Sequence, residues 1–313
     1  MRAKLFIASG ALAAMAWAVP VVGAAHFLGT RATGNVNAAV VRPGPARFRV
    51  EKERGLLLQV WINGRGPYLF AVDTGAGMNV ISQRVVTAAG LPTRTVPTTI
   101  IGGLSNARSF SNREAIIDRI ALDARANTLP SKQAALIVKN LPPDLDGILD
   151  PTEAFAPFGY SIDLPNEQIE ALPPGSIHPD TRLPDEGAIV PWVRMGSDNR
   201  PFVRLADGRT ALVDTGSVFG LAINGRDAVI LGRDGLRRTD SVRDIGGGTL
   251  VARRVNPTTI SIGGMELRRI PTDLLFGVDK NAPVILGRAA LRPFRISFDP
   301  QRKLIQFLTV SED

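Results

Sequence analysis

Two copies of the triplet Asp-Thr-Gly are the residues of this chain best suited to chemistry. Asp73 begins the first copy and Asp214 begins the second, and each follows an apolar run of strand character. A buried carboxylate without a partner is costly, because its charged form resists leaving water. Two carboxyls in contact cannot both ionise, so they share one proton and titrate as a unit. We therefore expect the two copies to meet in the folded chain.

A carboxyl pair that shares one proton can activate a water molecule. The ionised member takes a proton from the water while the protonated member polarises a carbonyl group, and this combination hydrolyses peptide bonds. Gly75 and Gly216 let the backbone lie close to the carboxyls. Thr74 and Thr215 can hydrogen-bond across the interface and hold the two loops in register. The pattern therefore predicts hydrolysis that runs on carboxylates.

The composition excludes several other kinds of catalytic site. The chain has 313 residues, no cysteine and two histidines, His26 and His178. Without cysteine there are no disulfides, thiol nucleophiles or Cys-ligated metal sites. Neither histidine lies beside other candidate residues, as a Ser-His-Asp triad or a zinc site would need, so we expect no metal and no cofactor. The net charge of +8 comes without an aromatic-interleaved basic stripe, so we expect no nucleic-acid partner.

The sequence around the triplets repeats over two segments of similar length. Each segment runs through a strand, a turn, a second strand, the triplet, a Gly-rich turn, a short apolar run, a helix-sized piece and two closing strands. The Gly-rich turns contain Gly102, Gly103, Gly246, Gly247 and Gly248. Helical periodicity is confined to short pieces, which predicts a mainly β protein with few short helices.

The repeat also sets the expected domain boundaries. A first lobe covers residues 45–171 and a second covers residues 188–313, joined by a Pro-rich linker at 172–187. Residues 1–25 have the basic start, apolar stretch and small residues of a signal peptide, and residues 26–44 form a polar spacer. We therefore expect export to the periplasm or another extracytoplasmic compartment, with a membrane tether if the leader is not cleaved.

These motifs together resemble the pepsin and retropepsin superfamily of aspartic proteases, and within it the bacterial retropepsin-like proteases with two lobes in one chain. The resemblance rests on two apolar-apolar-Asp-Thr-Gly motifs, two Gly-rich turns and the late run Ile285-Leu286-Gly287. It implies two homologous β-barrel lobes related by pseudo-twofold symmetry, and an aspartic endopeptidase that acts as a monomer on a peptide or unfolded protein. The implied catalytic pair is Asp73 and Asp214, and the implied flap tips are the Gly-rich turns. The implied supporting loops are Thr74, Gly75 and Ala76 in the first lobe and Thr215, Gly216 and Ser217 in the second.

The first lobe departs from this pattern at Asp150, which stands where the late glycine is expected. The run Asp150-Pro151-Thr152-Glu153 has the residue order of a helix start. We therefore expect Asp150 to be an N-cap and not a third catalytic carboxylate.

A second departure lies just after the triplets, where Ala76 of the first segment corresponds to Ser217 of the second. The Ser217 hydroxyl can donate a hydrogen bond to Asp214 and favour its ionised form, whereas Ala76 has no hydroxyl to offer Asp73. The sequence therefore predicts that the shared proton rests on Asp73.

Other hypotheses stay open at this point. The chain could be a peptide- or partner-binding protein that keeps the fold with little activity, because a fold does not certify chemistry. Each lobe could instead pair with its counterpart in another chain. Glycoside hydrolysis is disfavoured, because its carboxylates stand farther apart. The acidic run from Asp144 to Asp150 lacks the spacing and the closing Glu of a calcium loop.

Overall fold

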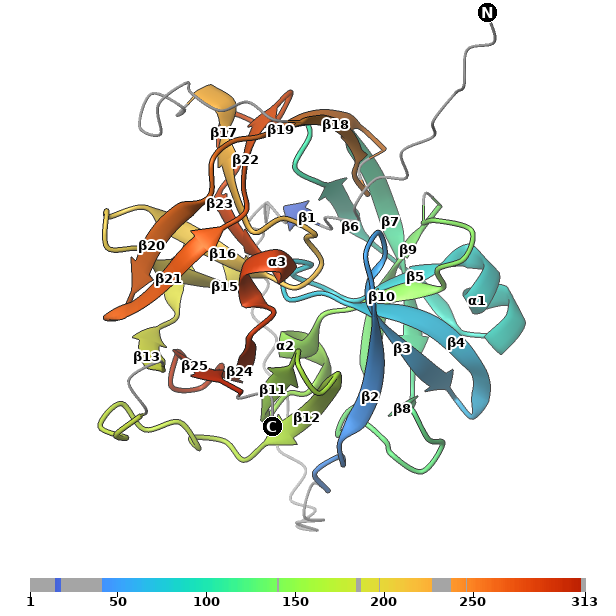
Figure 1. Ribbon diagram of the computed structural model, residues 1–313. Helices are drawn as coiled ribbons and strands as arrows, with labels where there is room; N and C mark the ends of the chain where they lie inside the picture. Colours follow the sequence, from blue (N-terminus) through green and yellow to red (C-terminus); the bar gives the residue numbers. More distant parts are fainter. Residues whose placement is uncertain are drawn as a thin grey trace, which may run out of the picture.

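The structure is a computed structural model that describes residues 15–17, 41–139, 141–183, 187–196, 198–226, 238–245 and 247–310. Over these ranges the chain is mainly β with three short α-helices, which confirms the predicted class. In Figure 1 the strands of the N-terminal half (residues 45–171) lie mostly on the right, in blue to green. Those of the C-terminal half (residues 188–313) lie mostly at the upper left, in yellow to red.

The N-terminal half builds a sheet around the strand that leads into the first triplet. Its strands are β2 (Ala46–Glu51), β3 (Gly55–Ile62), β4 (Arg65–Val72), β5 (Val80–Ser82), β6 (Thr93–Gly102), β7 (Arg108–Ile117), β8 (Ile120–Leu122), β9 (Gln133–Val138) and β10 (Gly147–Leu149). Strand β4 pairs antiparallel with β3 on one side and parallel with β10 on the other. Helix α1 (Gln83–Ala89) begins after the N-cap Ser82, whose hydroxyl accepts from the Val85 N–H, and ends at the left-handed Gly90.

The C-terminal half contributes an eight-stranded sheet and a separate two-stranded one. The larger sheet contains β14 (Val193–Met195), β15 (Asp198–Arg204), β16 (Thr210–Asp214), β17 (Leu221–Asn224), β18 (Arg238–Arg243), β19 (Thr249–Arg254), β22 (Thr272–Phe276) and β23 (Val284–Gly287), and the smaller contains β20 (Thr258–Ile262) and β21 (Met265–Ile270). Strand β16 pairs antiparallel with β15 and parallel with β23, as β4 does with β3 and β10. Strands β5 and β17 also match. Strand β5 pairs antiparallel with β10 and parallel with β9, and β17 pairs antiparallel with β23 and parallel with β22.

The two halves are joined at the base of the molecule by the strands that close each half. Each apolar run is followed by a short helix, α2 (Pro151–Ala154) or α3 (Arg288–Leu291), and by two strands. The strands are β11 (Gly159–Asp163) and β12 (Gln168–Leu172) in one half, and β24 (Phe294–Asp299) and β25 (Leu304–Thr309) in the other, with β13 (Ala188–Pro191) beside β25. Strand β11 pairs antiparallel with β24, so one sheet runs through both halves. On this sheet the rings of Tyr160 and Phe298 stack with centroids 4.7 Å apart.

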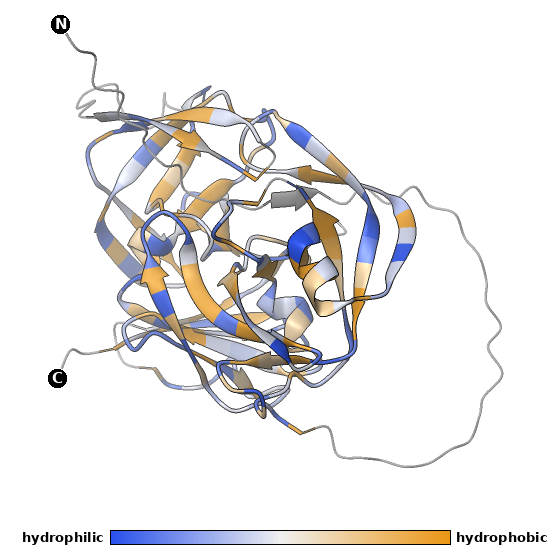
Figure 2. Ribbon diagram, turned by 90° about the vertical axis from the view of Figure 1, so that its right-hand side faces the viewer, coloured by the Kyte–Doolittle hydropathy of each residue, from blue (hydrophilic) through white to orange (hydrophobic). Residues whose placement is uncertain are grey.

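The core follows from the pattern of buried and exposed side chains along the strands. Leu56, Leu58 and Val60 of β3 are fully buried on one face, while on the other face Leu57 is buried and Gln59 is exposed. In Figure 2 the central strands are largely orange, whereas the peripheral hairpins alternate between orange and blue. Burial of apolar surface stabilises the fold by about 25 cal/mol per Å². This core fixes the strand ends from which the triplets emerge.

Several parts of the expected domain plan lie outside the described residues. They include the leader over residues 1–25, apart from β1 (Met15–Trp17), most of the spacer over 26–44, and residues 184–186 of the linker. Strand β1 pairs antiparallel with β6, with its three residues opposite Ile100–Gly102. Among the residues that the structure describes, no helix has both the length and the apolar character needed to cross a membrane.

Candidate active site

Each Asp-Thr-Gly triplet begins where an interior strand of its sheet ends. Asp73 follows β4, and its N–H donates to the carbonyl of Leu149 in the parallel neighbour β10 at 3.0 Å. Asp214 is the last residue of β16 and pairs with Gly287 of the parallel neighbour β23. The parallel partner strands therefore hold both aspartates at the carboxyl ends of their strands, where loops carry most functional groups.

The two loops approach each other crosswise, so that the glycine of one lies against the carboxyl of the other. A methyl group placed on Gly75 would lie 2.8 Å from the carboxyl carbon of Asp214, and one placed on Gly216 would lie 2.4 Å from that of Asp73. No real side chain comes this close, so glycine is required at both positions. The two carboxyls are within hydrogen-bonding reach of each other. The structure thus brings Asp73 and Asp214 together.

The threonines lock the two loops together beneath the carboxyls. The Thr74 N–H donates to the Thr215 hydroxyl at 3.1 Å, and the Thr215 N–H donates to the Thr74 hydroxyl at 3.0 Å. The hydroxyls in turn donate to the carbonyls that precede the opposite aspartates, those of Val213 and Val72. All of these groups are buried, so every bond is made away from competing water.

The surroundings favour different protonation states for the two aspartates. Burial, followed by the neighbouring Asp214 carboxyl, raises the pKa of Asp73 well above its ordinary value. Burial also raises the pKa of Asp214, but the hydrogen bond with Asp73, the Ser217 N–H and the cation of Arg288 oppose this rise. The pKa of Asp73 is thus raised with less opposition than that of Asp214, which favours the proton on Asp73 and the negative charge on Asp214.

The predicted role of the Ser217 hydroxyl is wrong. Within the described residues it is the backbone N–H of Ser217 that donates to Asp214 Oδ1, at 3.0 Å, while the hydroxyl accepts from the Phe219 N–H at 3.4 Å. In the first loop the Gly75 N–H donates to Asp73 Oδ1 at 2.7 Å, and the Ala76 N–H donates to the Asp73 carbonyl. Backbone donors therefore orient both carboxyls, and the difference between Ala76 and Ser217 does not set the position of the proton.

A known protein family described as aspartyl protease matches residues 58–149 of the sequence. This segment is similar to the aspartyl proteases. The aspartyl protease segment contains the first triplet and the first Gly-rich turn, and it ends on Leu149, whose carbonyl holds the amide of Asp73. The family resemblance is therefore confirmed over this segment. No curated protein matches the chain.

The two Gly-rich turns meet in the folded chain. Gly102 ends β6 and Gly103 opens the turn that leads to β7, while Gly247 and Gly248 lie in the turn between β18 and β19. Gly246, predicted as part of this second tip, lies outside the described residues. A methyl group on Gly103 would lie 2.2 Å from the carboxyl carbon of Asp244. The tips are therefore packed directly on one another.

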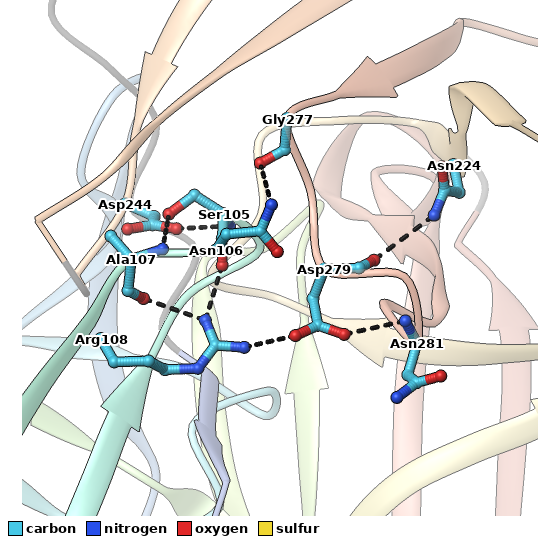
Figure 3. Close-up of polar contacts among 9 residues, drawn as sticks. All are labelled: Ser105, Asn106, Ala107, Arg108, Asn224, Asp244, Gly277, Asp279 and Asn281. Carbon is cyan, nitrogen blue, oxygen red and sulfur yellow. Dashed lines mark hydrogen bonds and ion pairs between the residues drawn. The ribbon is translucent and has the colours of Figure 1, made fainter.

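Polar contacts fasten the first flap to the C-terminal half (Figure 3). The Ser105 N–H donates to Asp244 Oδ2 at 2.6 Å, and Asp244 is buried. Arg108 forms an ion pair with Asp279 at 2.6 Å. The Asp279 N–H donates to the Leu104 carbonyl at 3.1 Å. We call this set of contacts, between residues 104–108 and residues 244 and 277–279, the flap latch.

The carboxyl pair is shut off from solvent in this structure. Asp73 is 1% exposed and Asp214 is 0% exposed. A substrate can therefore reach the pair only after the surrounding structure opens.

Arg288 is a site residue that the sequence analysis missed. It directly follows Ile285-Leu286-Gly287 and is 7% exposed. Its Nη1 donates to the carbonyls of Thr215 and Gly216, both at 2.9 Å, and its Nη2 donates to the carbonyl of Lys52 at 2.8 Å. Burial lowers its pKa to about 10, while the nearby aspartates raise it. Nothing in the sequence separates this arginine from the many on the surface, because its partners are backbone carbonyls far away in the chain.

The predicted N-cap at Asp150 is confirmed. Its carboxylate accepts the Thr152 N–H at 2.9 Å, and Pro151 occupies the first position of α2. Glu153 does not complete a capping box, because the Asp150 N–H donates to Asn79 Oδ1 and Glu153 accepts the Asn79 N–H.

Proposed function

We propose that the protein is an aspartic endopeptidase in which Asp73 and Asp214 share one proton and activate a water molecule between them. The observation that carries this proposal is the crosswise fit of the loops, with Gly75 against the Asp214 carboxyl and Gly216 against that of Asp73. Two carboxyls that are buried and adjacent can be kept only as a pair with one charge. A protein without need of this chemistry would gain nothing from burying them.

We further propose that the two halves are homologous lobes related by a pseudo-twofold axis that passes between the aspartates. The matched pairings support this, because β3, β4, β10 and β5 have the same partners and directions as β15, β16, β23 and β17. The reciprocal hydrogen bonds of Thr74 and Thr215 support it as well. On this proposal each lobe supplies one aspartate, one flap and one strand pair of the basal sheet, and the enzyme works as a single chain.

In the proposed reaction Asp214 acts first as a base and Asp73 as an acid. The Asp214 carboxylate takes a proton from water, and the water oxygen attacks the peptide carbonyl carbon. At the same time the Asp73 carboxyl gives its proton to the carbonyl oxygen, which produces a tetrahedral diol. Asp214 then delivers its proton to the amide nitrogen as the carbon–nitrogen bond breaks, and a diol proton returns to Asp73. The pair ends in its starting state.

The substrate class follows from the shape that the flaps impose. A strand-like peptide lying between flap and aspartates binds through backbone hydrogen bonds, with alternate side chains in pockets. A folded protein cannot present such a strand, so we propose that the substrate is a peptide or an unfolded protein. We also propose that the enzyme works outside the cytoplasm, on the strength of the leader-like sequence at residues 1–25.

The test is cleavage of an unfolded protein at mildly acidic pH by four forms of the chain. Asp73→Asn and Asp214→Asn each keep the shape of the side chain and remove the acid, so we expect each to lower kcat by about 10²–10⁴-fold. The matched control is Asp118→Asn, which removes an exposed carboxylate paired with Lys132 and should leave kcat unchanged.

Two results would contradict the proposal in different ways. If the wild type and Asp73→Asn behave identically, the carboxyl pair is not catalytic, and the chain is better explained as a binding protein. If Asp73→Asn loses only part of the activity and Asp214→Asn loses the rest, each aspartate works with its counterpart in a second chain.

A further inference from the structure

Asp150 lies beside Asp73 in the parallel sheet. Strands β4 and β10 pair in the register Val72 with Leu149, so the next residues along, Asp73 and Asp150, are lateral neighbours. The ladder in the other half pairs Asp214 with Gly287 at the same place. One aspartate of the pair therefore has a carboxyl beside it and the other has none.

The glycine in the C-terminal half is required by packing. A methyl group on Gly287 would lie 2.5 Å from the carbonyl oxygen of Phe219 and 3.0 Å from that of Ser217. The N-terminal half makes room for a longer side chain at the matching position. There Asn79 accepts the Asp150 N–H, and the Asp150 carboxyl, 5% exposed, accepts from Thr152.

An N-cap alone does not need a buried charge beside a catalytic carboxyl. Serine, threonine and asparagine cap helices about as well as aspartate does. Asp150 thus places a titratable group next to Asp73 where a neutral cap would serve the helix.

The groups around Asp150 come from four elements. Glu153 of α2 and Asp73 after β4 are acidic, Tyr160 of β11 reaches the same place through the Thr152 hydroxyl at 2.9 Å, and Arg200 of β15 is cationic. Burial and then Glu153 raise the pKa of Asp150 to about 7, while hydrogen bonds from Thr152 and the charge of Arg200 lower it. In the other direction, Asp150 adds to burial and Asp214 in raising the pKa of Asp73.

We propose that Asp150 is a positioning residue for the proposed reaction, a third buried carboxyl that holds the shared proton on Asp73 once it carries a negative charge. The inference rests on the proposed function and deepens it, because it adds one side chain to the groups that make the pair asymmetric. A negative charge beside Asp73 opposes the loss of its proton. Asp150 ionises near neutral pH, the range in which the pair would otherwise lose its shared proton. The charge of Asp150 therefore extends activity toward neutral pH.

The test compares the wild type with Asp150→Asn and Asp150→Ser, two variants that keep a capping oxygen and remove the charge. We expect the alkaline limb of the kcat/KM profile against pH to move to lower pH in both, so that activity at neutral pH falls several-fold more than activity at pH 5. The control is Glu153→Gln, which removes a neighbouring carboxylate but keeps an oxygen that can accept the Asn79 N–H. It leaves the charge beside Asp73 in place, so its alkaline limb should not move to lower pH.

A second readout does not depend on activity. The carboxyl carbon of Asp73, identified by its absence from the ¹³C NMR spectrum of Asp73→Asn, should titrate at lower pH in Asp150→Asn than in the wild type. If it titrates at the same pH in both, the inference is overturned even if the enzyme is active. If its titration moves but no form cleaves peptides, the proposed function fails while the coupling of Asp150 to Asp73 stands.

Discussion

Ser105 and Val278 face each other as an antiparallel bridge between the first flap and the loop that follows β22. Opposed residues of antiparallel strands lie at a separation that a disulfide can span. The chain contains no cysteine, so a single introduced pair has no competing partner. A disulfide introduced at these two positions can therefore lock the latch on oxidation and release it on reduction.

We expect Ser105→Cys/Val278→Cys to lose cleavage of an unfolded protein when oxidised and to regain it on reduction. The aspartates are closed off from solvent, and on the proposed function the flaps must part to admit a substrate, so the lock should keep the substrate out. The activity of each single-cysteine variant, with and without oxidant, serves as the control. Full activity of the oxidised double variant, with the disulfide verified by mass spectrometry, would mean that the substrate enters by another route.

Thr74→Val and Thr215→Val test the contact that holds the two loops together. Each change keeps the shape of the side chain but leaves a buried N–H of the opposite loop without its acceptor, which costs about 1–3 kcal/mol. The free energy of unfolding, measured by urea denaturation, should fall by that amount. The double variant should lose less than the sum of the single changes, because the two hydroxyls also contact each other, at 3.5 Å. Additive losses would show that this contact does not couple them.

Ser217→Ala should leave the acid limb of the activity profile where it is in the wild type. The hydrogen bond to Asp214 comes from the backbone N–H of residue 217, which alanine retains. The pH dependence of kcat/KM measures this directly. A shift of the acid limb would show that the hydroxyl turns toward Asp214 in solution.

Arg288→Met should move the acid limb to higher pH. The cation of Arg288 lowers the pKa of Asp214 against the effect of burial, so without it Asp214 takes up a proton at higher pH and the base is lost earlier on acidification. Arg288→Lys keeps the charge and loses the planar geometry that reaches carbonyls of both halves. The lysine variant should therefore be less stable but should keep the acid limb closer to that of the wild type.

The stability of the protein should fall as pH rises from about 4 toward 7. Burial raises the pKa of Asp150 from 3.8 to about 7, so the folded chain holds a proton in this range that the unfolded chain has released. A group with a raised carboxyl pKa stabilises the fold below its unfolded value and loses that contribution as pH rises through the folded value. Asp150→Asn should flatten this part of the curve by an amount on the order of a few kcal/mol, measured by urea denaturation across pH.

The sequence predicted those features that depend on neighbouring residues. The Asp150 cap followed from the order Asp-Pro-Thr-Glu, and the two closing strands of each half followed from the order of features that the halves share. The sites of the Gly-rich turns also emerged from local pattern. Each of these structures is specified within about ten residues of chain, where local rules suffice.

Apart from the meeting of the two triplets, which the repeat predicted, features that depend on contacts between distant residues were missed. The latch joins Arg108 to Asp279, and Arg288 binds the carbonyl of Lys52. Either arginine is indistinguishable by type from those that pair on the surface. The error at Ser217 has another cause, since a backbone N–H that takes the place of a hydroxyl leaves no trace in the residue type.

The ladder between β11 and β24, which pairs Ser161 with Ser297 at the base of the molecule, has a consequence for how the protein behaves at low concentration. Because the two halves belong to one chain, the pairing of β11 with β24 does not depend on the concentration of the protein. Turnover per molecule should therefore be the same at nanomolar as at micromolar concentration, with no lag on dilution.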